Sequence, residues 1–264
     1  MRREMCYNIC KLYLNSSVVD KGGLNMNVAL VFAGGSGQRM RTSAKPKQFL
    51  EIYGKPIIIY TLEIFEKHKD IDSIVVPCIA GWEDYLQELL DKFGIKKVKK
   101  ILTGGKDTQE SKMIALRYLE TFCKEDDIVL LHDAVRPLIT EELITDNIEG
   151  VKKYGNAITA VPFTETAITS QDGEQVEKTI IRNTMFVAKA PQSFYFKDVF
   201  EAHTKGETMP YTITIDTCSL MTELGKELHM VPCKTTNIKI TTPEDYFILK
   251  ALIDLRESQD IFGL

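Results

Sequence analysis

The sequence lacks the features that mark several large classes of protein. Its six cysteines form no C-x-x-C pair and its four histidines show no H-x-x-x-H spacing, so a zinc site has little support. No window approaches the roughly 18 apolar residues of a membrane span. An excess of basic residues is also missing, because the formal net charge is −4, which argues against a nucleic-acid-binding protein.

A secretory signal is absent as well, because Asn8, Lys11 and Asn15 interrupt the apolar residues near the N-terminus. Reduced thiols and a cytoplasmic location are therefore expected. Residues 1–26 show no clear period and precede the first predicted strand. We expect this segment to be an extension, either disordered or upstream of a natural start at Met26, and residues 27–258 to form a single domain.

Strand-like and helix-like segments alternate from Val28 onward. Short apolar runs predict strands at residues 28–32, 73–78, 98–102, 128–131 and 157–161. Apolar residues at helical spacing predict helices at 55–68, 82–93 and 109–123, and Thr140 is expected to cap a fourth helix. This alternation predicts an α/β fold with a mostly parallel, twisted, Rossmann-like sheet that is covered by helices on both faces.

The pattern changes after Pro162, where the predicted strands become short. Extended segments at 166–168, 175–181 and 186–188 surround Asp172-Gly173, a dipeptide typical of hairpin turns. We predict a β-arm over about 163–188 that projects from the sheet and pairs with a second copy of the chain. Two short helices, one strand and a last helix are expected at 196–203, 216–224, 229–233 and 243–255.

The first predicted strand ends in a loop that is rich in glycine and delivers two cations. Gly34, Gly35 and Gly37 let the backbone approach a ligand, and Arg39 and Lys47 follow on the same loop. The loop lacks the G-x-x-x-x-G-K-[ST] of a P-loop, and Met40 stands where a dinucleotide fingerprint has its third glycine. A phosphate-binding loop is one hypothesis, and a structural turn with two solvated cations is the other.

A charged segment follows the strand at 128–131. Asp133 at the end of a parallel strand is well placed to hold Mg²⁺ through oxygen. Arg136, three residues later, can pair with Asp133 or with a substrate. The alternative is that Asp133 caps the next helix and has Arg136 as its structural partner. Because carboxyl ends of parallel strands meet at one edge, loops 33–47, 103–111 and 132–137 are expected to build one site.

Taken together, several dispersed motifs resemble one family in their order and spacing. The resemblance runs from about Val28 to Leu255, and the family is the cytidylyltransferases that act on polyol phosphates. It includes the 2-C-methyl-D-erythritol 4-phosphate enzyme of isoprenoid synthesis and the ribitol-5-phosphate enzyme of wall and capsule polymers. The motifs are residues 33–40 with 45–49, then 132–137, 182–183, 190–194 and 237–245.

The resemblance implies CTP and a polyol phosphate as substrates, Mg²⁺ as cofactor and a homodimer formed through the β-arm. It implies that the CTP phosphates are held by Ala33, Gly34, Gly35, Ser36, Gly37, Arg39 and Lys47. Gly105 and Ser111 would lie near the cytosine or ribose, and Asp133 would bind the metal. The substrate phosphate and the reacting groups would be surrounded by Arg136, Thr166, Arg182 and Lys239, with Arg39, Lys47 and Lys239 as the catalytic cations.

Two departures from the family pattern bear on activity. Thr108 stands where the family usually has an arginine, and Ala190 where it usually has a threonine. A nucleotide-binding regulator without catalysis is therefore an alternative. Val135, Trp82 and the segment around Cys218 favour ribitol 5-phosphate, and the methylerythritol phosphate enzyme is the close alternative. Helix packing is the plainer explanation of Trp82.

Overall fold

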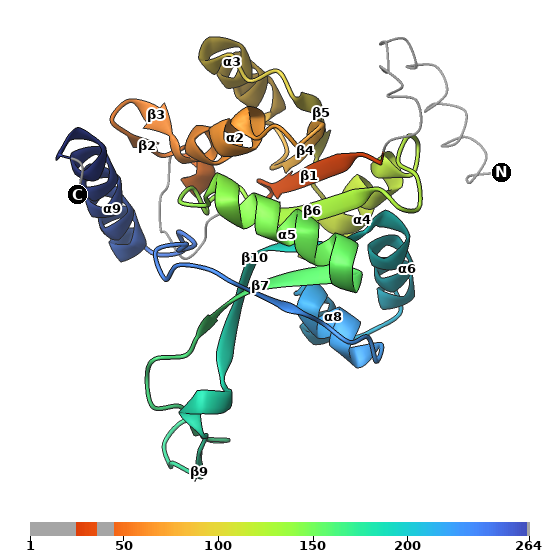
Figure 1. Cartoon of the computed structure of the whole chain (residues 1–264), viewed down its shortest axis with the longest axis vertical. Coiled ribbons are helices and arrows are strands. Elements are labelled where there is room, and N and C mark those ends of the chain that lie inside the picture. The colour runs from red at the N-terminus through yellow and green to blue at the C-terminus, as the bar shows by residue number, and fades with distance from the viewer. Residues whose placement is uncertain (1–24, 36–44, 263–264) are drawn as a thin grey trace.

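The computed structural model describes residues 25–35 and 45–262, so most of the predicted extension 1–26 lies outside the described residues. Within them, a seven-stranded sheet crosses the body of the molecule (Figure 1). Its order is β11 (Met230–Pro232), β7 (Asn156–Pro162), β10 (Phe186–Tyr195), β6 (Ile128–Asp133), β1 (Asn27–Phe32), β4 (Ser73–Cys78) and β5 (Val98–Thr103). In this sheet β10 is antiparallel to β6 and β7, and the other neighbours are parallel. The prediction of a mostly parallel α/β sheet is confirmed.

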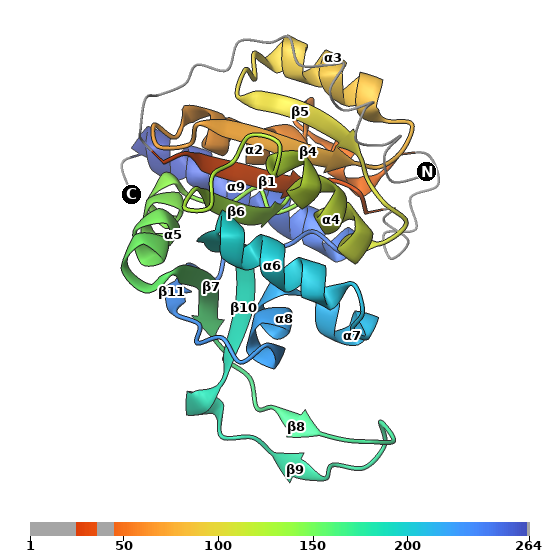
Figure 2. The ribbon, with the colours of Figure 1, turned by 90° about the vertical axis from the view of Figure 1, so that its right-hand side faces the viewer.

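Alternate residues of β1 face two layers of helices, as the period of a strand requires. Ala29 and Val31 belong to the apolar cluster of α2 (Ile57–Lys67), α3 (Glu83–Phe93) and α5 (Glu141–Tyr154). Val28 and Leu30 belong to the cluster of α4 (Thr108–Leu119), α6 (Phe196–Gly206) and α8 (Thr217–Glu223). Figure 2 shows α5 and α4 on opposite sides of β6. Burial on both faces explains why these strands are continuous apolar runs.

Local signals in the sequence set the ends of several helices. Gly94 ends α3 with a φ of 69°, a left-handed conformation that glycine adopts without strain. The Thr140 hydroxyl accepts a hydrogen bond from the Leu143 N–H, so the predicted cap of α5 is confirmed. Helix α2 begins at Ile57 rather than at residue 55, because Lys55–Pro56 form β3 and pair with β2 (Glu51–Ile52). This small hairpin was not predicted.

The last helix, α9 (Pro243–Phe262), is longer than predicted and packs outside the two main layers. Its residues Leu249 and Ile253 join a third apolar cluster with Ile240 and Val135. The segment that precedes α9 is thereby held against the end of β6. This contact matters for function, because residues 237–240 lie in that segment. Among the helices in the described part of the chain, none has both the length and the apolar composition of a membrane span.

The prediction for strand β10 was wrong in length. A short strand at 186–188 was expected, but the strand continues to Tyr195 and enters the main sheet between β6 and β7. Proline is unusual in a strand with neighbours on both sides, because it cannot donate a hydrogen bond to a ladder, and β10 contains Pro191. The structure accommodates it with a shift of register between Ala188 and Gln192, a break in pairing at which proline is tolerated.

The predicted β-arm is present and projects from the body (Figure 2). Its paired strands are only β8 (Ile168–Thr169) and β9 (Lys178–Thr179), shorter than the predicted 166–168 and 175–181. At the tip, Asp172 accepts hydrogen bonds from the N–H groups of Glu174 and Gln175, and Gly173 has a φ of 78°. The predicted turn is therefore formed by the residue types that favour it.

Candidate active site

A cavity of about 540 Å³ lies at the edge of the sheet where β1, β4, β5 and β6 end. Most of the predicted site residues within the described part of the chain meet on its wall. Those that line it are Ala33, Gly34, Gly35, Lys47, Gly105, Ser111, Asp133 and Lys239. The loops after three strands therefore meet at one cavity, as the parallel topology predicts.

The first wall of the cavity is the start of the glycine-rich loop. The Ala33 N–H donates to the Pro77 carbonyl at 2.8 Å, which ties the loop to β4. The buried Gln48 side chain donates to the carbonyls of Ala33, at 2.6 Å, and Gly35, at 3.3 Å. Gln48 thus fixes the loop, a role that the sequence did not reveal. Ser36, Gly37 and Arg39 lie outside the described residues, and their roles stay predictions.

The second wall is the turn between β5 and α4. The Ser111 hydroxyl accepts from the Gly105 N–H at 3.0 Å and donates to the Asp107 carbonyl at 2.8 Å. A Cβ atom on Gly104 would lie 2.9 Å from the Cys78 carbonyl oxygen, so this position requires glycine. Thr108 also lines the cavity, and its side chain brings no charge there.

The floor of the cavity holds a carboxylate between two cations. Lys239 Nζ lies 2.6 Å from Asp133 Oδ1, and Arg136 Nη2 lies 3.2 Å from Asp133 Oδ2. Burial favours the protonated acid, but the charges of Lys239 and Arg136 outweigh it and hold the pKa of Asp133 below its ordinary value. Asp133 is therefore ionised at neutral pH, and its carboxylate oxygens can bind a cation.

Arg136 is a buried partner of Asp133 and does not line the cavity. Besides Asp133, its guanidinium donates to the Asn237 carbonyl at 2.8 Å, and Lys189 donates to the same carbonyl at 3.1 Å. The contact between Arg136 and Asp133 that the structural alternative predicted is therefore present. Asp133 does not cap the next helix, since Thr140 does so. Asn237 and Lys189 were not assigned these roles from the sequence.

Lys47 reaches the cavity from the short helix η3 (Lys47–Phe49). Its side chain is buried, and Nζ donates to the Ile240 carbonyl at 2.9 Å. Ile240 in turn donates its N–H to the Val135 carbonyl, which joins this segment to the loop after β6. Residues 47, 133 and 239 are thus fixed to one another although they are far apart in the sequence.

The donor set fits a magnesium ion that also binds phosphate. The described residues hold no group of three or more His, Cys, Asp or Glu side chains that could enclose a metal. Mg²⁺ often needs only one or two carboxylates, with waters and substrate phosphates completing its shell. The ionised carboxylate of Asp133 on the cavity wall meets that need.

The predicted residues of the β-arm are not brought to this cavity within one chain. Thr166 and Arg182 are both exposed, and the Arg182 guanidinium donates to the Thr164 carbonyl at 3.3 Å. The arm points away from the body in Figure 2. Their predicted roles therefore depend on a second copy of the chain.

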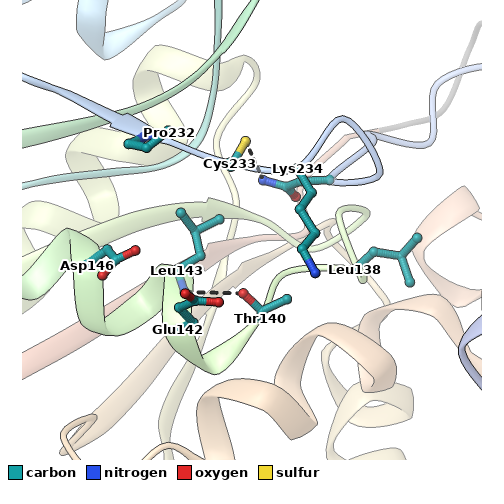
Figure 3. A pocket seen from close by; sticks show the side chains of 9 residues that line it. Leu138, Thr140, Glu142, Leu143, Asp146, Pro232, Cys233 and Lys234 are labelled. Carbon is teal, nitrogen blue, oxygen red and sulfur yellow. Dashed lines mark hydrogen bonds between the residues drawn. The ribbon is translucent and has the colours of Figure 1, made fainter. Parts of the chain in front are cut away.

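A second cavity, of about 270 Å³, lies between α5 and the segment after β11 (Figure 3). Its walls carry Glu142 and Asp146 from α5, with Cys233 and Lys234 from the opposite segment. None of the predicted site residues lines it. Trp82, another open question, stacks on Phe49 with ring centroids 5.0 Å apart, which confirms the helix-packing explanation.

A glycine-rich loop, two lysines and an ionised carboxylate at the carboxyl edge of a parallel sheet define an α/β enzyme of the nucleotidyltransferase type. Comparison with known proteins narrows this class. The family model described as 2-C-methyl-D-erythritol 4-phosphate cytidylyltransferase (IspD) matches residues 27–255. The chain belongs to this family of cytidylyltransferases.

Individual relatives agree with this assignment. The chain is similar to the ribitol-5-phosphate cytidylyltransferase of Vibrio parahaemolyticus, with 50% identity over 90% of this chain and 100% of that protein. A protein of the same name from Streptococcus agalactiae serotype V is 43% identical over 90% and 100% of the two chains. Among solved structures, the 4-diphosphocytidyl-2C-methyl-D-erythritol synthase of Anaerococcus prevotii matches with a TM-score of 0.75 and 26% identity, covering 87% of this chain and 96% of that one.

Proposed function

We propose that this enzyme transfers CMP from CTP to ribitol 5-phosphate, giving CDP-ribitol and pyrophosphate. The observation that carries the proposal is the meeting of Lys47, Lys239 and Asp133 with the glycine-rich loop in one cavity. The names of the relatives at 50% and 43% identity support ribitol 5-phosphate as the polyol. The product would be the activated ribitol phosphate of wall or capsule polymers.

The reaction needs no nucleophile from the protein. An oxygen of the ribitol phosphate attacks the α-phosphorus of CTP, a new P–O bond forms, and the bond to pyrophosphate breaks on the opposite side. Negative charge on the phosphate oxygens is stabilised by fixed cations, and Lys47 and Lys239 are already held in place by backbone and carboxylate partners. Arg39 would add a third cation from the loop.

Asp133 would hold Mg²⁺, with phosphate oxygens of CTP and water as the remaining ligands. When bound, the ion neutralises charge on the phosphates. Lys239, which forms a salt bridge with Asp133 in this structure, would then be free to contact a phosphate. Turnover in the presence of EDTA, with and without added Mg²⁺, tests this assignment, and full activity without a divalent ion would contradict it.

A panel of polyol phosphates tests the choice of substrate. Pyrophosphate release is measured with CTP and ribitol 5-phosphate, 2-C-methyl-D-erythritol 4-phosphate or other pentitol phosphates. We expect the highest kcat/KM with ribitol 5-phosphate. Highest turnover with the methylerythritol phosphate would replace the proposed substrate, and CTP binding without turnover of any polyol phosphate would identify the non-catalytic regulator.

We also propose a homodimer in which the β-arm of one chain reaches the cavity of the other. The arm exposes apolar side chains, with Val176 at 64% and Ile181 at 72% exposure, and these residues would be covered in a dimer. Arg182 would then add a cation at the ribitol phosphate. We further place the protein in the cytoplasm, in keeping with free thiols at Cys78, Cys123, Cys218 and Cys233.

A further inference from the structure

Helix α4 contains a lysine that the sequence gives no reason to expect inside the protein. The side chain of Lys112 is buried, with 6% of its surface exposed. Its Nζ donates one hydrogen bond, to the Ile215 carbonyl at 3.0 Å. Within the described residues, no carboxylate forms a salt bridge with it. A buried cation without an ionic partner costs free energy, so its presence needs an explanation.

The ammonium of Lys112 keeps its charge in spite of burial. Burial lowers its pKa to about 8, and the charges of Asp216 and Asp133 act in the opposite direction. A group with that pKa is mostly protonated at pH 7. The interior behind the cavity therefore contains a positive charge, and the Ile215 carbonyl is its one hydrogen-bond acceptor among the described residues.

The position of Lys112 relates this charge to the cavity. Lys112 stands one helical turn after Thr108 and directly after Ser111, and both of those residues line the cavity. Residues four apart share a helix face, and side chains lean toward the N-terminus of their helix, here the end that borders the cavity. Tyr211 of α7 (Tyr211–Thr214) also lines the cavity, and Ile215 follows that helix directly.

The charge also acts on the reacting end of the cavity. Lys112 interacts electrostatically with Asp133 and Lys239, which lie on the floor where the two substrate phosphates meet in the proposed reaction. These substrates bring several negative charges to a cavity whose described lining carries two carboxylates, Asp133 and Asp107, and three lysines, at positions 47, 106 and 239. A buried cation behind the wall is screened little by salt, so its attraction for phosphate persists at physiological ionic strength.

We infer that Lys112 is a positioning residue for the phosphates of the substrates. Its buried positive charge lies behind the cavity wall, and a bound phosphate chain provides the negative charge that balances it. This inference rests on the proposed function and identifies an additional determinant of nucleotide affinity. It predicts a division of effects: loss of the charge weakens phosphate binding but does not weaken the fold.

Two substitutions test the inference. Lys112→Met removes the charge and the hydrogen bond, and Lys112→Gln removes the charge but keeps a donor for the Ile215 carbonyl. Replacing a buried charge by an apolar group of similar size is often neutral or stabilising, so the melting temperature of unliganded Lys112→Met is expected to stay the same or rise. The matched control is Lys99→Met, because Lys99 lies over the Phe122 ring and does not line the cavity.

Binding is measured with inorganic tripolyphosphate, by calorimetry and by the shift in melting temperature, and the KM for CTP is measured in parallel. We expect both Lys112 variants to bind tripolyphosphate on the order of tenfold more weakly, with KM for CTP raised similarly and kcat changed less. Wild-type affinity in either folded variant would overturn the inference. Absence of wild-type turnover would overturn the proposed function instead, because tripolyphosphate binding needs no turnover.

Discussion

The cavity and the β-arm hold their cations in opposite ways. Lys47 and Arg136 are buried, and each donates to a backbone carbonyl that a distant segment supplies. Arg182 on the arm is exposed and donates to one carbonyl of the arm itself, at 3.3 Å. A group that is already fixed stabilises charge without reorganisation, whereas an exposed arginine loses conformational freedom when it binds.

This difference separates what one chain can complete from what it cannot. The cavity proposed for the nucleotide is built by segments that belong to one core, and Lys47, Gln48 and Ser111 have hydrogen-bond partners there before any ligand binds. The arm is a two-stranded hairpin with exposed apolar side chains, a type of structure that is marginal on its own in water. The polyol side of the site would therefore depend on assembly, and the nucleotide side would not.

Replacing Lys47 by alanine is expected to have the largest effect. The substitution removes a cation that is already held in position at the proposed phosphate site. Loss of one such donor typically lowers kcat by about 10²–10³-fold. Pyrophosphate release measures the effect, and thermal unfolding checks that the variant is folded. The control is Lys197→Ala, an exposed residue that pairs with Asp126 on the surface and should leave turnover unchanged. Near-wild-type turnover of Lys47→Ala would remove Lys47 from the site.

Acid should destabilise the body of the protein through His132, which lies beside Asp133. Its ring is fully buried, packs edge-on against Phe65 and has a pKa that burial lowers to about 4. Below about pH 6.5 an unfolded histidine takes up a proton, whereas the buried His132 stays neutral until the pH approaches 4. The free energy of unfolding is therefore highest above about pH 6.5 and falls as the pH falls toward 4. The difference in pKa corresponds to roughly 3 kcal/mol of unfolding free energy.

Denaturant unfolding between pH 7 and pH 4.5 tests this effect in the wild type and in His132→Gln. The variant should lose less stability over this range, although part of the slope remains because burial also lowers the pKa of His203, to about 3. Residues 163–188 contain no histidine, so the arm should contribute nothing to this slope. Equal slopes for the two proteins would show that His132 does not titrate in this way.

Arg182→Ala is expected to lower kcat/KM by about tenfold to a hundredfold, through the polyol phosphate, while leaving stability unchanged. The sharper experiment co-expresses Arg182→Ala chains with Lys47→Ala chains. If the arm acts across a dimer, half of the dimers are mixed and each mixed dimer has one site with both cations, so about a quarter of the activity returns. Failure of the mixture to exceed the two separate variants would place Arg182 in the site of its own chain or outside the reaction.

Local signals explain which parts of the fold and site were predictable. The apolar runs of β1 and β6, the left-handed Gly94 and the capping Thr140 each follow from a few neighbouring residues. The carboxyl-edge position of Asp133 also follows, because parallel strands end on the same side of a sheet.

Tertiary contacts explain the rest. Only the first three residues of β10 were predicted, because Pro191 is unfavourable inside a strand and the rest of β10 is stabilised by pairing with β6 and β7. Arg136 and Asn237 are 101 residues apart, and nothing local links them. Lys112 resembles a surface lysine in the sequence, because its burial depends on the packing of α4 near residues 211–217.

The smallest expected effect comes from Ser111→Ala, which probes the wall of the cavity between β5 and α4. The substitution removes the acceptor of the Gly105 N–H and the donor to the Asp107 carbonyl, while the glycine at 104 still fixes the turn. A hydrogen bond of this kind contributes about 0.5–1.5 kcal/mol, so KM for CTP should rise about two- to tenfold with kcat nearly unchanged. Ser219→Ala, an exposed position on α8, serves as the control. Because Ser111 is expected on the nucleotide side, KM for ribitol 5-phosphate should not change. An effect confined to that substrate would reverse the assignment of the two sides of the site.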